Sequence, residues 1–246
     1  MVARLAAAVV LAMLPTRALA QGNTLDDVRL YQSFFHDSPV AAAPYVQGGV
    51  VCEGYDAASR LSLGGQGGAP VIPGAEVQGA VGFSSLDYDN ELAEGQSGIN
   101  DLLLAGRYRV PLQAAQAAVG GWITLPVGDE DLGEGNLDLG FFGAARHRLP
   151  QLVVTGVVGV DFLDFATGRE ASLRGAGGVI YPASERLAVI GELALRSKLA
   201  YGLLTGGVDY RLAGTGRVRG FLGLGVDNGA PDLVLAGSFL YPFPAP

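Results

Sequence analysis

The chain has few of the residues on which several classes of protein depend. It contains a single cysteine, Cys52, so no internal disulfide can form, and this residue is interpreted as a small apolar side chain in a strand. Its two histidines, His36 and His147, belong to no cysteine and histidine cluster, so no metal site and no cofactor are expected. Beyond the first twenty residues no apolar run is long enough for a membrane-spanning helix, which excludes a helical membrane protein.

Basic residues are also scarce. The chain has 16 Lys and Arg residues against 24 Asp and Glu residues, and the first twenty residues hold two of the basic ones and no acid. The other 226 residues therefore carry a net charge of −10. Such an acidic chain is repelled by phosphate backbones, so nucleic acid is not expected as a partner.

The first twenty residues have the pattern of a secretory signal peptide. Arg4 supplies the positive charge, residues 5–14 form a short apolar run, and Ala18-Leu19-Ala20 is a small-residue cleavage site before Gln21. The apolar run is too short for a membrane anchor. We therefore expect export and cleavage after residue 20.

What the chain has in abundance is glycine, 38 residues, and alternation with a period of two. In residues 136–149, Leu139 and Phe141 fall on one parity, whereas Asp138 and Arg146 fall on the other. The alternating segments are ten or more residues long, whereas strands of soluble sheets are usually about 5–6 residues long. Tilted strands that cross a bilayer need about 9–11 residues. The sequence therefore predicts an all-β, up-and-down, antiparallel transmembrane barrel; a soluble secreted β-sandwich, with shorter strands, is the alternative.

Three regions are predicted: a signal peptide at 1–20, a periplasmic lead-in or small plug at 21–45, and the barrel at 46–246. The lead-in does not alternate, and Leu25, Val28 and Phe35 fit one or two turns of a short helix. The barrel divides into twelve expected strands, an even number as single-chain bacterial barrels have. They are 46–54, 59–66, 75–88, 99–110, 115–127, 136–148, 151–163, 170–182, 187–197, 200–212, 217–227 and 231–243.

The connections between these strands alternate between two kinds. One end has short turns, and the other has the long acidic loops 87–98 and 128–135. Outer-membrane barrels have short periplasmic turns and longer outer loops, so we expect both chain ends at the periplasmic side. The loop 128–135 was weighed as a calcium site, but its spacing is not that of an EF-hand, and a solvated acidic loop is favoured.

Rings recur on the apolar parity just before the short turns or the C-terminus. Amphipathic rings at a membrane boundary form an aromatic girdle, so we expect contact with outer-membrane lipid there. The last strand also ends in aromatic residues, like the terminal signature that the barrel-assembly machinery recognises, and this machinery is an expected partner. The expected periplasmic girdle consists of Tyr108, Tyr181, Tyr210 and Tyr241, with His147 at the same height.

Charged residues collect on the other parity, which faces the barrel interior. A charge on the lipid side would cost up to about 2–4 kcal/mol at the bilayer midplane, so these side chains are expected to line a lumen or a rim. Two interpretations remain open: a wet channel, or a closed interior filled by arginine–carboxylate pairs. The candidate lumen-lining residues are Arg107, Arg109, Asp138, Arg146, Arg148, Arg217 and Arg219.

No catalytic residues are predicted. Barrel hydrolases and acyltransferases place a histidine and a serine at the outer leaflet. His36 lies in the lead-in and His147 lies near a short turn, so neither position suits that chemistry. The chain is therefore not expected to be an enzyme.

The central stretch resembles a known family. Residues 100–109, NDLLLAGRYR, precede Leu125-Pro126-Val127-Gly128-Asp129 and residues 132–138, LGEGNLD. This order resembles outer-membrane transporters of the meta-cleavage pathway of phenol degradation, in which a strand of the type GDLLLGAKYRL precedes LPTGD…LGxGxxD. Asn100 stands where that family has glycine.

The resemblance implies an outer-membrane barrel that passes small compounds, aromatic or apolar ones among them, by passive transport. The sequence does not name the substrate. The alternative function is a structural or surface-interaction barrel with a filled interior and no transport.

Overall fold

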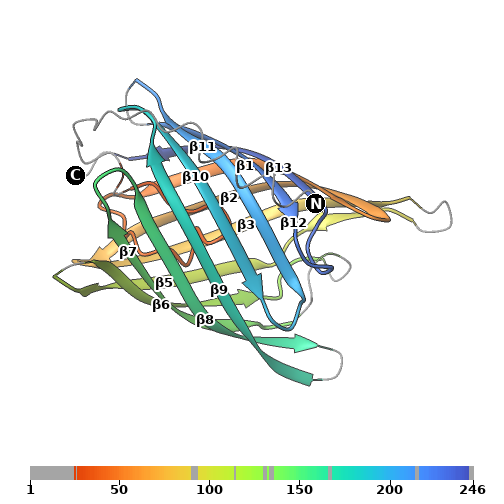
Figure 1. Ribbon diagram of the computed structural model, residues 1–246. Coiled ribbons are helices and arrows are strands. Elements are labelled where there is room, and N and C mark those ends of the chain that lie inside the picture. Colours follow the sequence, from red (N-terminus) through yellow and green to blue (C-terminus); the bar gives the residue numbers. More distant parts are fainter. Residues whose placement is uncertain are drawn as a thin grey trace.

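The computed structural model describes residues 25, 27–89, 94–113, 115–129, 132, 136–165, 168–213 and 216–243. The predicted signal peptide lies outside the described residues. These residues form one closed antiparallel barrel (Figure 1). Its strands are β1 (Tyr45–Tyr55), β2 (Ala58–Ile72), β3 (Ala75–Tyr88), β4 (Gln96–Ile99), β5 (Leu102–Pro111), β6 (Gln116–Leu125), β7 (Leu139–Arg148), β8 (Val153–Phe165), β9 (Gly168–Pro182), β10 (Leu187–Arg196), β11 (Tyr201–Arg211), β12 (Arg217–Gly225) and β13 (Leu233–Pro242).

Apart from β4 and β5, strands that follow one another in the sequence pair with each other, β1 pairs with β13, and the pairing of β2 with β3 closes the sheet. The short β4 and the longer β5 both pair with β3, one after the other along its length. Together they occupy one strand position of the barrel, which is interrupted at Asn100 and Asp101. The barrel therefore has twelve strand positions, which confirms the predicted fold class.

The boundaries differ from the expected ones mainly at β2. It was expected at 59–66 and extends to Ile72. Gly64, Gly65, Gly67 and Gly68 hide the alternation in the sequence, yet the backbone pairs with β1 up to Gly68 and with β3 as far as Ile72. Backbone pairing needs no side chain, so the glycines end the pattern without ending the strand.

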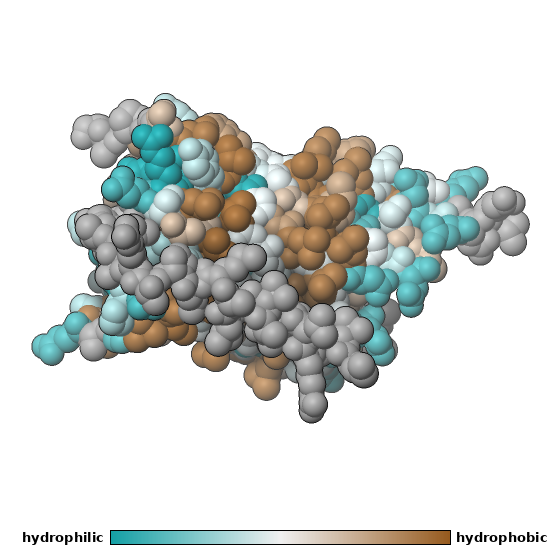
Figure 2. All heavy atoms as spheres, turned by 45° about the horizontal axis from the view of Figure 1, so that its top comes forward, coloured by the Kyte–Doolittle hydropathy of each residue, from teal (hydrophilic) through white to brown (hydrophobic). Residues whose placement is uncertain are grey.

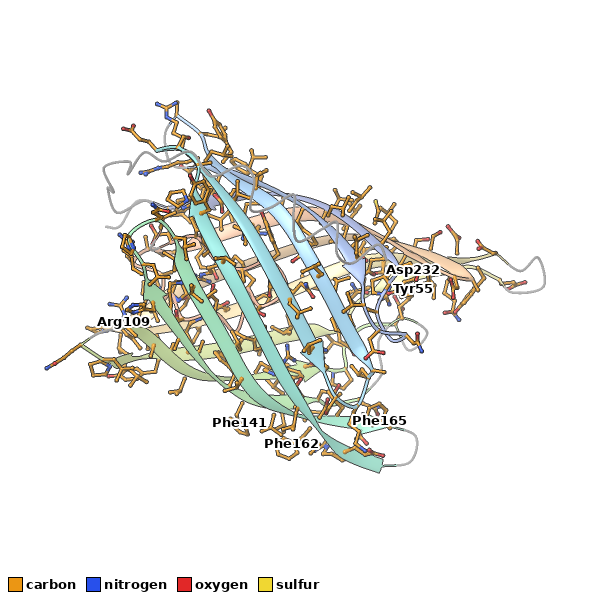
Figure 3. All side chains as sticks on the ribbon, viewed as in Figure 1. Tyr55, Arg109, Phe141, Phe162, Phe165 and Asp232 are labelled. Atoms are coloured by element: carbon orange, nitrogen blue, oxygen red, sulfur yellow. The ribbon has the colours of Figure 1, made fainter. Side chains whose placement is uncertain are left out.

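The outer surface is apolar across its middle. A brown band lies between more polar ends in the face shown in Figure 2. Phe141 and Phe162 project outward from the wall (Figure 3), and Phe141 is among the most exposed aromatic side chains. Among the described residues, no helix has the length and apolar character needed to cross a membrane. The outward parity of the strands accordingly supplies the apolar surface that the alternation predicted.

The two ends of the barrel differ. Arg109 lies close to the end with short turns, where β1 begins and β13 ends. Tyr55, Phe165 and Asp232 lie toward the opposite end (Figure 3). The three widest intervals between strands, from β3 to β4, from β6 to β7 and from β12 to β13, are at this opposite end. We call the two ends the short-turn end and the long-loop end.

Candidate functional site

Residues 27–44 lie inside the barrel. Arg29 is bonded to Glu76 on β3, Asp37 to Arg146 on β7, and the backbone of Tyr31 to a carboxylate on β10. A single segment can touch strands on all sides of a closed barrel only from within. We call residues 27–44 the luminal segment; it joins β1 directly at Tyr45.

The luminal segment forms turns and bends from Tyr31 to Ser38 rather than the short helix considered from the sequence. Glu192 on β10 holds the first of these turns. Its carboxylate accepts the backbone N–H groups of Tyr31, Gln32 and Ser33 at 2.8, 3.0 and 2.9 Å. Consecutive N–H groups at the start of a turn need an outside acceptor, and here the barrel wall supplies it.

Asp37 is the main anionic anchor within the segment. Its side chain is completely buried, and it accepts the N–H groups of Leu30 and Ser38 at 3.0 and 2.7 Å. From the wall, Thr155 Oγ1 donates to it at 2.9 Å and Arg146 Nη2 at 2.7 Å. Four donors satisfy this carboxylate, so its burial is compensated in the docked position.

Three wall arginines donate to main-chain carbonyls of the segment and of the adjoining Leu25. Arg107 on β5 reaches the carbonyl oxygens of Phe34 and Pro39 at 3.0 and 3.1 Å. The other two lie on β7 and β12 and bind in the same way. Arg146 donates to Val28 O at 2.8 Å and Leu25 O at 3.2 Å, and Arg219 donates to Arg29 O and to Leu30 O at 3.3 Å.

Arg29 anchors the side of the segment that faces β3. Its guanidinium donates to both carboxylate oxygens of Glu76, at 2.9 and 2.8 Å, and to the hydroxyl of Tyr45 at 2.8 Å. The N–H group of Ala41 also donates to Glu76, at 2.8 Å. Both bonds to Glu76 come from Nη2, while Nη1 binds Tyr45, so the guanidinium is held by two side chains at once.

The candidate lumen residues from the sequence separate into three groups. Arg107, Arg146 and Arg219 meet around the luminal segment and are buried. Arg109 and Arg148 are exposed at the short-turn end, where they line a cavity of about 460 Å³.

The two remaining candidates bond to other parts of the wall. Arg217 donates to Asp209 at 2.7 Å, and the same carboxylate forms an ion pair with Arg219 at a distance of 3.0 Å. Asp138 is buried and accepts the N–H group of Asp164 at 2.8 Å. Asp138 therefore binds the backbone near the end of β8.

Sequence reasoning did not identify four of the residues that hold the segment: Arg29, Asp37, Glu76 and Glu192. Glu76 and Glu192 do carry a signal, because each is a carboxylate on the inward parity within a strand. Arg29 and Asp37 carry none, since they lie in a stretch without periodicity and their wall partners are 47 and 109 residues away.

Known proteins resemble this chain in structure rather than in sequence. No protein-family model matches the chain, and no curated protein sequence matches it. Solved structures do match. An outer membrane channel from Pseudomonas putida F1 aligns with a TM-score of 0.68 at 14% identity, over 87% of this chain and 100% of that one.

The fold is that of outer-membrane barrels. The KdgM porin aligns with a TM-score of 0.56 at 11% identity, over 80% of this chain and 99% of its own. The CymD monoaromatic hydrocarbon channel aligns with a TM-score of 0.50 at 9% identity, over 85% and 90%. At these identities the likeness concerns the fold, and the resemblance to the phenol-pathway family stays a prediction.

The four girdle tyrosines lie as the parity requires. Tyr108, Tyr210 and Tyr241 are 51%, 41% and 38% exposed, and Tyr181 is partly exposed. Tyr181 and Tyr210 lie near each other in height, since they pair with Val189 and Leu187 of β10. Their membrane contact stays a prediction, because the exposure shows only that these rings are on the outer surface.

His36, in the luminal segment, occupies an environment that disfavours its charged form. It is buried, its Nδ1 lies 3.4 Å from Arg174 Nη1, and its ring packs edge-on against Phe142 at 5.0 Å between centroids. Burial, followed by the charges of Arg174, Arg196 and Arg107, lowers the pKa of His36 well below its ordinary value of 6.5. The docked segment therefore holds a neutral histidine.

Acidification is expected to weaken docking through His36. An undocked His36 gains a proton below about pH 6.5, whereas the docked residue does not, so docking loses free energy as the pH falls through this value. Bilayer conductance measured from about pH 8 down to about pH 5 should rise, and the rise should shrink in His36→Gln. An equally steep rise in the variant would assign the pH dependence to other groups.

Proposed function

We propose that the protein is an outer-membrane channel for passive diffusion of small compounds, in which the luminal segment is the small plug considered from the sequence. Export by the cleaved signal peptide and insertion by the barrel-assembly machinery would bring it to the bacterial outer membrane. Its apolar outer band would contact lipid, with the short-turn end in the periplasm.

The observation that carries this proposal is the choice of partners made by the wall charges. Some wall charges pair with each other, as Arg174 does with Asp161 at 2.7 Å, whereas others bind the luminal segment. Here Arg107 and Arg146 donate to the luminal segment, and Glu192 accepts its backbone N–H groups. If the segment left, these groups would line a wet, polar lumen with water in place of main-chain partners.

For the transported class we propose small compounds that include aromatic or apolar ones, as the sequence resemblance implies. The luminal segment presents aromatic rings to the interior. Phe34 packs edge-on against Phe35 at 5.7 Å between centroids, and Tyr31 lies 4.7 Å from Phe221 on β12. Such rings offer apolar contact surface along a path that is otherwise polar.

The second candidate is a structural or surface-interaction barrel that transports nothing. The dense hydrogen bonding of Asp37, whose side chain is completely buried, favours it. This candidate requires the luminal segment to stay docked under all conditions.

A proteoliposome swelling assay distinguishes the two candidates. The full chain is refolded in detergent, its barrel is verified by heat-modifiable gel migration, and solutes of increasing size are offered. We expect entry of small solutes with a sharp size limit. If no solute enters with the full chain and none enters with a folded variant that lacks residues 25–43, the channel is contradicted and the structural barrel is favoured.

A further inference from the structure

A second cavity lies on the long-loop side of the luminal segment. It has a volume of about 390 Å³, within the range of small-molecule pockets. Its wall comes from β1, β2, β3, β5, β12 and β13 and from Asn100 and Asp101 before β5. Its floor comes from Tyr31, Gln32, Phe34 and Phe35 of the segment. No residue proposed to hold the segment in place contributes to it, apart from Arg219.

The recess in its wall is built by three glycines in register. Gly49 on β1 pairs with Gly64 on β2, and Gly64 pairs with Gly82 on β3. All three share the inward parity of Tyr45, whose hydroxyl binds Arg29 in the lumen. Three adjacent strands thus lack side chains at one height, which leaves room beside the segment.

Uncharged polar side chains surround this recess. Gln47 donates to Ser238 Oγ at 3.0 Å, while its own amide oxygen has no hydrogen-bond partner among the described residues. The amide oxygen of Asn100 is likewise without a partner among them. Ser62 and Gln66 complete the polar wall.

The charged groups of the lining are already engaged. Arg219 donates to the luminal segment and pairs with Asp209 at 3.0 Å. Asp101 accepts the N–H group of Gly128 at 3.0 Å. The cavity therefore offers a ligand neutral amides and hydroxyls on one side and aromatic rings on the other.

We propose that this cavity binds a small uncharged ring compound that carries hydroxyl groups. The ring lies against the aromatic floor, and its hydroxyls donate to the amide oxygens of the wall, because those oxygens have no donor of their own. A carboxylate has no free cation to meet there, and an unsubstituted hydrocarbon leaves the amides unpaired. This inference rests on the proposed function, because the ligand would reach the cavity through the lumen from the long-loop end.

Two kinds of compound share this chemistry: hydroxylated aromatics and neutral sugars. Both have an apolar face and a hydroxylated edge. The probes are therefore catechol, glucose, toluene and benzoate, which vary the ring, the hydroxyls and the charge one at a time. Calorimetric titration of the detergent-solubilised full chain measures their binding.

The matched variants are Gly64→Val and Gly65→Val, neighbours in β2 that face opposite sides of the wall. A Cβ at Gly64 meets no atom nearer than 3.7 Å, and one at Gly65 meets none within 4 Å, so both strands can form. Gly64→Val fills the recess and is expected to weaken binding at least about tenfold, or about 1.4 kcal/mol. Gly65 also lines the cavity, but a side chain at this position points to the outer surface, so Gly65→Val should leave binding unchanged.

Binding of catechol or glucose, with weak binding of toluene and benzoate, supports the proposal. Tighter binding of catechol would identify the ligand as a hydroxylated aromatic, and tighter binding of glucose would identify it as a neutral sugar. Equal effects of the two variants, benzoate as the tightest probe, or no binding of any probe would overturn it. Solute flux is measured separately. Flux without binding would contradict this site but support the channel, whereas binding without flux would contradict the channel but support the site.

Discussion

Removal of residues 25–43 is expected to convert a narrow, plugged barrel into an open channel with a several-fold higher conductance. The wall closes without this segment, since every strand pairs with its neighbours along the sheet. Water entering the lumen would solvate the side chains that the segment now covers, such as Arg107, Arg146 and Glu192. Twelve strands enclose more space than the eight of a filled barrel.

Planar-bilayer recordings of the full chain and the deletion variant provide the measurement. The arginines Arg107, Arg146, Arg217 and Arg219 would then face the carboxylates Glu76, Glu192 and Asp209, which should give the open state a modest preference for anions. Heat-modifiable migration of both proteins controls for folding. An unchanged conductance in a folded deletion variant would contradict the plug and leave the structural barrel.

The second large effect is expected from Asp37→Ala. This change removes the acceptor of Arg146, Thr155 and two backbone N–H groups at once. Removing one partner of a buried ion pair costs about 3–5 kcal/mol, here drawn from the docking of the luminal segment. The undocked population should therefore rise by about two orders of magnitude or more.

Ser38→Cys in a Cys52→Ser background reports docking directly. Ser38 is completely buried, and its hydroxyl has no hydrogen-bond partner among the described residues, so the cysteine should be tolerated. Its maleimide labelling rate should rise with Asp37→Ala. Glu170→Gln, which breaks the exposed pair of Glu170 with Lys198, is the matched control and should change nothing. Equal labelling rates with and without Asp37 would show that this carboxylate does not hold the segment.

A double variant tests the pair itself. Asp37→Ala with Arg146→Met removes both charges, so no buried arginine loses its bond to the Asp37 carboxylate. Labelling in the double variant should be slower than in Asp37→Ala alone. A rate as fast as in the single variant would mean that the other hydrogen bonds of the two residues, from Arg146 to Val28 and Leu25 and from the backbone to Asp37, outweigh their ion pair.

The sequence by itself determined the wall of this protein. Apolar residues such as Phe141 alternate with inward residues such as Arg146 because each strand has one face toward an apolar outside and one toward the interior. Every residue of a strand must meet that requirement. The fold class, the twelve strand positions and the inward direction of the arginines could therefore be predicted. The glycine-rich end of β2, where side chains are missing, and the short β4, which begins inside the expected loop 87–98, escaped the pattern.

Only the tertiary structure decided what fills the lumen. Asp37 and Arg146 are 109 residues apart, and Glu192 lies 159 residues from Ser33, so no local pattern links them. The recess at Gly64 likewise exists only because register places two other glycines beside it. Alternation specifies which face a residue occupies, whereas a partner across the lumen depends on the closure of the barrel and the path of the segment through it.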